Sequence, residues 1–204
     1  MNSRTDESKD TRERILATAR RIMVGKGFAA VGLNEILTAA GVPKGSFYHY
    51  FNAKDAFGEA LLDSYFDEAW SALDATLQAP GLNAAQRLLN YCQLWEAGQL
   101  CGDYQGTCLT VKLGAEVADV SEAMRHALER GVSGLIARLA AAIEAGVADG
   151  SVRVEEPAAQ VAQSLYQLWL GASVAVKIFR SPQPFSNALA ATRVMLGLSE
   201  PVAA

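Results

Sequence analysis

Three cysteines are the residues of this chain whose chemistry is easiest to recognise: Cys92, Cys101 and Cys108. Their number is odd, and the polar start MNSRTDESKD lacks the apolar run of a secretory signal, so we expect free thiols in a reducing cytoplasm. Paired CxxC motifs are absent from the sequence, and His49 and His126 are not placed to complete a zinc site. Any cysteine that reacts would do so as the thiolate.

Cys108 has the strongest physical case for reactivity. It falls in the expected first turn of a helix over 106–118, after Gly106-Thr107, where helix N–H groups favour the thiolate. Lys177 is a lone cation in the apolar run 168–179. If it lies near Cys108, it lowers the thiol pKa further and can trap an oxidised sulfur. The alternative is an inert packing role, which is common for cysteines in helical cores.

The other two cysteines are weaker candidates. Cys101 stands at an expected helix break, near Gly102-Asp103, and can act as a second thiol. Cys92 has helical-core spacing with Leu88, Leu89 and Trp95, which favours packing.

Charge is distributed unevenly along the chain. Residues 1–55 hold nine Lys and Arg against six Asp and Glu, a net of +3, whereas the remainder carries −7. A basic head can face a polyanion, and the acidic body would repel one. The alternative is an ordinary solvated charge pattern.

The head contains two short helices joined by a tight turn. The first is expected over 33–40 and ends at Gly41, and the second is expected over 43–50, where Pro43 suits a helix start. This is the geometry of a helix-turn-helix, whose second helix enters the major groove of DNA by its N-terminal end. In that first turn, Lys44 can reach bases or phosphate, and exposed N–H groups attract phosphate.

Five ring side chains crowd the second of these helices. Phe47, Tyr50 and Phe51 share a face by their spacing, and we expect them to form a small core with Ile36, Leu37 and Val42. Tyr48 and His49 point elsewhere, and Lys54 is a further phosphate candidate. The alternative is a plain helical hairpin with an exposed Tyr-His pair.

The sequence predicts an all-α fold of about nine helices. The first runs from Asp10 to Lys26, the fourth opens at Lys54 and fades near Gln78, and five more follow at about 83–100, 106–118, 121–148, 157–180 and 185–197. The charge-free run 157–176 raises the question of a membrane span, but its Gln and Ser residues favour a buried or interface helix.

The order of a basic helix, GF, a short helix, AGVxKGxxYHYF and KD resembles the TetR family of bacterial transcriptional repressors, from about Thr11 to Tyr65. The resemblance implies a three-helix DNA-binding domain over 9–69, with its helix-turn-helix at about 32–51, and a C-terminal regulatory and dimerisation domain over 70–204. It also implies the residues that face a palindromic operator: Asn34, Pro43, Lys44, Gly45, Ser46, Tyr48, His49 and Lys54. One departure is Val31-Gly32, where the family often has a hydroxyl residue, so a phosphate contact there must come from backbone N–H groups or from Asn34.

The body resembles one branch of this family, the repressors of N-ethylmaleimide reductase, in GTCLTVKLGAEV, DVSEAMR and LYQLWLGASVAVKIFRS. That branch senses electrophiles and oxidants through cysteine. The resemblance therefore implies Cys108 as the sensor, with Lys177 and Cys101 as accessory residues.

The last two helices, 157–180 and 185–197, are the expected homodimer interface. The first is apolar around much of its circumference, so it needs cover on two sides. Two major-groove readers must also stand ~34–36 Å or a multiple apart, which only a dimer provides. Burial of both helices within one monomer is the alternative.

The sequence bears on two rival functions. An enzyme is disfavoured because the sequence contains no GxSxG, P-loop or GxGxxG motif, and we expect no cofactor or metal. The second rival is a TetR-type regulator induced by reversible binding of a small apolar ligand, in a tentative pocket lined by aromatic residues: Tyr91, Trp95, Tyr166, Trp169 and Phe179.

Overall fold

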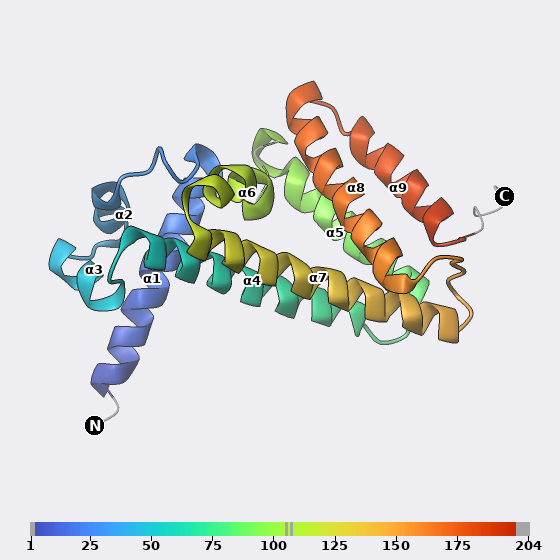
Figure 1. The fold of residues 1–204 in the computed structure, drawn as a ribbon, viewed down its shortest axis with the longest axis horizontal. Coiled ribbons are helices and arrows are strands. Elements are labelled where there is room, and N and C mark those ends of the chain that lie inside the picture. The colour runs from blue at the N-terminus through green and yellow to red at the C-terminus, as the bar shows by residue number, and fades with distance from the viewer. Residues whose placement is uncertain (1–2, 105, 107, 199–204) are drawn as a thin grey trace. The chain divides into compact units, whose positions relative to one another are not determined.

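The computed structural model describes residues 3–104, 106 and 108–198, and over this part of the chain all regular structure is α-helical (Figure 1). The helices are α1 (Ser3–Lys26), α2 (Leu33–Ala40), α3 (Lys44–Tyr50), α4 (Lys54–Leu77), α5 (Ala84–Tyr104), α6 (Leu109–Val120), α7 (Glu122–Ala148), α8 (Ala158–Phe179) and α9 (Gln183–Met195). The predicted all-α class is confirmed.

The chain forms two compact units. The first combines residues 1–67 with 108–131, and the second combines 68–107 with 132–204, so α4 and α7 each contribute to both. The domain boundary expected between residues 69 and 70 stays a prediction.

In the first unit, apolar stripes determine which faces of α1 and α2 are buried, and one turn determines where α2 ends. Ile15, Ala19 and Met23 of α1 are fully buried. Helix α2 ends where Gly41 takes a left-handed conformation with φ of 65°, and the N–H of Val42 then donates to the carbonyl of Leu37 at 3.0 Å. A residue with a Cβ is disfavoured at that φ, which explains why the helix stops at this glycine.

In the second unit, α8 lies beside α9 and packs on α5 (Figure 1). The rings of Trp169 and Phe185 stack with centroids 5.5 Å apart. The Trp169 indole N–H donates to the hydroxyl of Thr192 at 2.9 Å, and the Trp95 indole donates to Ser173 at 2.9 Å. These buried hydroxyls let the indoles enter the core without leaving an N–H unpaired.

Aromatic rings of α4 pack directly against two glycines of α7, one in each unit. A Cβ at Gly131 would overlap the ring of Phe66 in the first unit, and one at Gly134 would lie 2.5 Å from the ring of Trp70 in the second. The two helices therefore approach each other at positions where a side chain on α7 has no room.

Three helix boundaries differ from the sequence prediction. Helix α1 begins at Ser3 rather than Asp10, and α6 begins at Leu109 rather than 106. Helix α5 was expected to break at Gly102-Asp103 but continues to Tyr104. A single helical glycine costs only ~1 kcal/mol, and the left-handed turn comes later, at Gly106 with φ of 66°.

Among the described residues, α7 is the one helix long and apolar enough to meet the criterion for a membrane span. Core helices of soluble proteins meet the same criterion, so the finding is weak. The run 157–176, which raised this question in the sequence, lies mostly in α8 and does not meet it.

Candidate DNA-reading surface and thiol site

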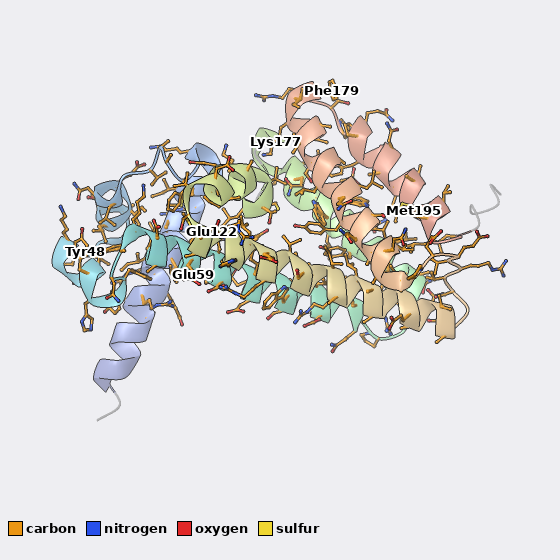
Figure 2. The ribbon with its side chains drawn as sticks, viewed as in Figure 1. Tyr48, Glu59, Glu122, Lys177, Phe179 and Met195 are labelled. Carbon is orange, nitrogen blue, oxygen red and sulfur yellow. The ribbon has the colours of Figure 1, made fainter. Side chains whose placement is uncertain are left out.

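The outer face of α3 carries the residues expected to read DNA. Lys44 and Gly45 are exposed in its first turn, His49 is exposed, and the side chain of Tyr48 is 56% exposed. Figure 2 shows Tyr48 on the outer side of this helix. Ser46 is only half-buried, so the predicted surface is accessible along the whole helix.

The inner face of α3 is held by phenylalanine rings that pack edge to face or tilted against one another. Phe47 and Phe51 have ring centroids 5.1 Å apart, and Phe57 of α4 lies 5.3 Å from Phe47 and 5.1 Å from Phe51. The expected partners Ile36, Leu37 and Val42 are buried with them, whereas Tyr50 is only half-buried. The rings therefore fix the orientation of a helix only seven residues long, which could not hold its shape alone.

The start of α2 offers backbone groups rather than a side-chain cap. Gly32 is its N-cap and has no side chain to cap the helix, although its carbonyl accepts the N–H of Glu35 at 3.1 Å, so the first N–H groups have no side-chain cap. The neighbouring Asn34 is exposed. A helix N-terminus of this kind suits a phosphate. A hollow of about 330 Å³ between α2 and α3 brings three predicted DNA-binding residues, Asn34, Pro43 and Lys44, onto one surface.

Lys54, the other predicted phosphate contact, is exposed at the start of α4. Its ammonium lies over the ring of Phe28, 4.8 Å from the centroid. That contact holds the lysine on the surface of the head while leaving its charge in solvent.

Cys108 is the N-cap of α6 and is half-buried. The hydroxyl of Tyr65 in α4 donates to its sulfur at 3.4 Å. The guanidinium of Arg20 in α1 lies over the Tyr65 ring, 5.1 Å from the centroid. Sequence reasoning placed Cys108 correctly near the helix start but missed both partners, because they are distant in the chain. Thr107, which was expected beside it, lies outside the described residues.

The other two thiols differ sharply in environment. Burial raises the pKa of the Cys92 thiol to about 12, so about a thousandfold less thiolate forms there than at an ordinary cysteine at neutral pH. Cys101 is exposed, and its S–H points at the carbonyl of Gly98, 3.0 Å away. Accessibility therefore leaves Cys101 and Cys108 as the thiols open to reagents.

Lys177 is half-buried near the end of α8 (Figure 2). Its ammonium lies 3.2 Å from the place where a Cβ on Gly106 would stand, and the buried amide oxygen of Gln99 crowds the same point. Gly106 precedes Cys108 by two residues in the chain. The sequence prediction that Lys177 acts on Cys108 stays a prediction.

Glu116 joins α6 to the turn between α1 and α2. Its carboxylate accepts the N–H of Phe28 at 3.1 Å and the N–H of Ala29 at 2.5 Å. A Cβ on Gly27, where φ is 87°, would stand 3.0 Å from the same carboxylate. Glu116 lies eight residues after Cys108. The same helix therefore has the thiol at its start and hydrogen-bonds to the DNA-reading head near its end.

The four residues predicted to line an apolar pocket do meet in the second unit. Tyr91, Trp95, Tyr166 and Trp169 line a cavity of about 10 Å³, which is room for one water at most. Pockets for small ligands are typically ~300–1,000 Å³. The further prediction for Phe179 is wrong, because that side chain is 69% exposed on the last turn of α8 (Figure 2).

Sequence comparison assigns this architecture to a family. Residues 15–61 match the model of the bacterial regulatory proteins of the tetR family, and residues 84–192 match that of the tetracyclin repressor-like C-terminal domain. The chain belongs to the TetR family of DNA-binding transcriptional regulators and is not an enzyme.

Individual relatives narrow the comparison. The chain is 45% identical to the HTH-type transcriptional repressor NemR of Escherichia coli K12 over 192 residues, which cover 93% of this chain and 94% of that one. The crystal structure of reduced E. coli NemR matches with a TM-score of 0.88 at 42% identity, covering 95% of this chain and all of that one. The transcriptional regulator AcuR of Cereibacter sphaeroides is 32% identical over 79% of this chain and 74% of its own.

Proposed function

We propose that this protein is a dimeric transcriptional repressor in the cytoplasm, and that it releases a palindromic operator when Cys108 reacts with an electrophile or an oxidant. The similarity to a named repressor over nearly the whole chain supports the repressor role. The observation that carries the sensing role is α6, which has Cys108 as its N-cap and contacts the head through Glu116.

The sensing reaction follows from thiolate chemistry. The sulfur stands at the N-terminus of a twelve-residue helix, where backbone N–H groups stabilise negative charge. With a maleimide, the thiolate adds to the activated double bond, forming a C–S bond while the neighbouring carbon takes a proton. With hypochlorous acid, the thiolate takes the OH as a sulfenic acid and chloride leaves. Either product changes the size and hydrogen bonding of the N-cap residue of α6.

The signal would then travel along one helix. A bulkier or oxidised sulfur displaces the start of α6, and Glu116 lies two helical turns along the same helix. Its two hydrogen bonds go to the backbone immediately ahead of α2. A shift of α6 therefore strains or releases the segment that sets the position of the helix-turn-helix, which is how a local modification can change operator affinity.

Operator release by modified variants tests the sensing role. We expect N-ethylmaleimide or hypochlorite to release the operator from the wild type and from Cys101→Ser, and to leave Cys108→Ser bound in an electrophoretic or anisotropy assay. Cys101→Ser is the matched control because it removes the other accessible thiol. If Cys108→Ser releases DNA as the wild type does, Cys108 is not the sensor.

Lys177 enters this scheme as an accessory cation. Lys177→Met keeps the length and apolar stem of the side chain and removes its charge. We expect operator release to need about ten times more oxidant, because the neutral amine attacks the sulfenic acid, forms an S–N bond and releases the sulfenic oxygen as water. Alkylation by N-ethylmaleimide should change less, because a thioether carries no group that the amine can displace. Equal responses of variant and wild type to hypochlorite would remove Lys177 from the scheme.

The dimer surface we propose is the outer side of α8 and α9. Exposed apolar residues stand along it: Val174, Ile178 and Phe179 on α8 and Val194 on α9, with exposures between 43% and 80%. Apolar side chains exposed in a row mark a surface that another protein covers. A second copy placed on these helices would form a four-helix interface and bring two heads to one operator.

Reversible induction by a small apolar ligand is the alternative. The aromatic lining of Tyr91, Trp95, Tyr166 and Trp169 favours it, but the cavity would have to enlarge more than tenfold. Under this alternative, Cys108→Ser would keep its full response to the inducer.

A further inference from the structure

We propose that Tyr65 is a positioning residue for the Cys108 thiol, and that Arg20 holds Tyr65 in that role. This inference rests on the proposed function, because it assigns the group that tunes the sensor. It concerns residues of α1, α4 and α6 that all belong to the first unit.

The contact has the direction that activates a thiol. The Tyr65 hydroxyl is the donor and the Cys108 sulfur the acceptor, with 3.4 Å between them. A thiolate accepts a hydrogen bond much more strongly than a neutral thiol, since bonds to a charged group are roughly twice as strong. The tyrosine hydroxyl therefore stabilises the reactive thiolate in preference to the resting thiol.

Arg20 strengthens this donor in two ways. Its guanidinium lies 5.1 Å from the centre of the Tyr65 ring, so the attraction between cation and ring fixes the side chain of a half-buried tyrosine. The cation also withdraws negative potential from the ring, which makes the phenolic hydroxyl a better donor. Its positive charge additionally favours a thiolate that accepts the hydrogen bond of the same tyrosine.

The groups that the structure places around Cys108 come from three helices. Tyr65 of α4 donates to the sulfur, Arg20 of α1 lies over the tyrosine ring, and in α6 the backbone N–H of Lys112 donates to the Cys108 carbonyl at 3.2 Å. The charged side chain with a contact in this group is Arg20, a cation, which acts in the same direction as the tyrosine hydroxyl.

Alkylation of Cys108 also affects the hydrogen bond that its sulfur accepts from Tyr65. A thioether sulfur is a weak acceptor and cannot become a thiolate, so alkylation of Cys108 removes the strong form of the bond that joins the start of α6 to α4. Helix α4 opens at Lys54, four residues after α3 ends, so the tyrosine stands on the helix that follows the reading helix. Tyr65 therefore stabilises the thiolate before the reaction. After the reaction, the weakened bond to Tyr65 changes a contact of α4, the helix that follows the reading helix.

The experiment measures alkylation of Cys108 by iodoacetamide against pH, in a Cys101→Ser background so that Cys108 is the accessible thiol. We expect Tyr65→Phe to move the midpoint of the rate profile upward by about one pH unit and to lower the rate at pH 7 about tenfold, which is what loss of a hydrogen bond to a charged group gives. Arg20→Gln should move the midpoint in the same direction by less, and Arg20→Lys should restore part of it.

Tyr50→Phe is the matched control, because it removes the hydroxyl of another half-buried tyrosine of the same unit. It should leave the profile unchanged. An unchanged midpoint in both Tyr65→Phe and Arg20→Gln would overturn the inference. Because the rate profile reports the thiol and not DNA release, this inference can fail while Cys108 remains the sensor. Conversely, operator release that persists in Cys108→Ser would overturn the proposed function whatever the profile shows.

Discussion

The DNA-reading head and the second unit differ in which side chains they expose to solvent. In the head, the phenylalanines turn inward and Lys44, Tyr48 and His49 stay exposed. In the second unit, the indoles of Trp95 and Trp169 bond internally to Ser173 and Thr192. That unit also exposes large apolar side chains on α8 and α9, at Val174, Ile178, Phe179 and Val194.

The difference indicates two kinds of partner. A surface with exposed cations and an uncapped helix start suits a hydrated polyanion, and binding there is expected to be strongly dependent on salt. A surface of exposed valine, isoleucine and phenylalanine suits a dry protein partner, whose binding is insensitive to salt. Four sets of variants test this contrast.

The largest effect is expected from charging the apolar surface. Val174→Asp with Ile178→Asp should give a monomer in sedimentation, since two carboxylates cannot be buried in a dry interface. Operator affinity should fall on the order of a thousandfold, because the second head no longer binds as part of the same particle. Val147→Asp, at a 49% exposed valine of α7, is the control and should remain dimeric. A dimeric double variant would place the interface elsewhere.

Substitutions at two adjacent ring residues of α3 should affect stability and DNA binding separately. Phe47 is 1% exposed, so Phe47→Ala should lower the free energy of unfolding of the head by about 3–5 kcal/mol in a thermal or urea melt. Tyr48→Ala should leave the melt unchanged and weaken operator binding about tenfold, as expected when one direct interaction with DNA is removed. Equal effects of the two variants on stability would contradict the division of the rings into core and surface.

Glu116 tests whether the Cys108 thiol and the DNA-reading head are coupled through α6. Glu116→Ala removes the acceptor of two backbone N–H groups, so modification of Cys108 should release the operator less completely, with an induction ratio at least a few-fold below that of the wild type. Asp119→Asn, at an exposed acid on the same helix, is the control. An unchanged induction ratio in Glu116→Ala would require another route to the head.

The smallest effect concerns the salt dependence of the head. Lys44→Ala should reduce the slope of log affinity against log salt by about one, because the variant neutralises one phosphate fewer. Titration of operator binding between low and physiological salt measures the slope. A shallow slope in the wild type itself would count against the polyanion surface.

The local features of the head could be predicted from sequence because they depend on neighbours in the chain. Gly41 ends α2 at the predicted residue, and the burial of Phe47 and Phe51 follows from helical spacing. The helix expected to start at about 121 starts at Glu122, next to Ser121, whose hydroxyl accepts the N–H of Met124 at 3.5 Å.

The parts that could not be predicted depend on long-range packing. Tyr65 meets Cys108 across 43 residues, and Glu116 meets Phe28 across 88, distances over which periodicity carries no signal. Phe179 looked like a pocket residue because it continues the apolar run of α8, but it lies on the last turn, where the helix no longer has a neighbour on every side.

The two glycines of α7 that pack against rings of α4 restrict which substitutions this sequence can tolerate. Even alanine at position 131 or 134 would collide with Phe66 or Trp70, so neither helix can change there without the other. In a library of random substitutions selected for operator binding, these two positions should remain glycine although neither touches DNA or the thiol. Variants that escape should carry a smaller residue at position 66 or 70.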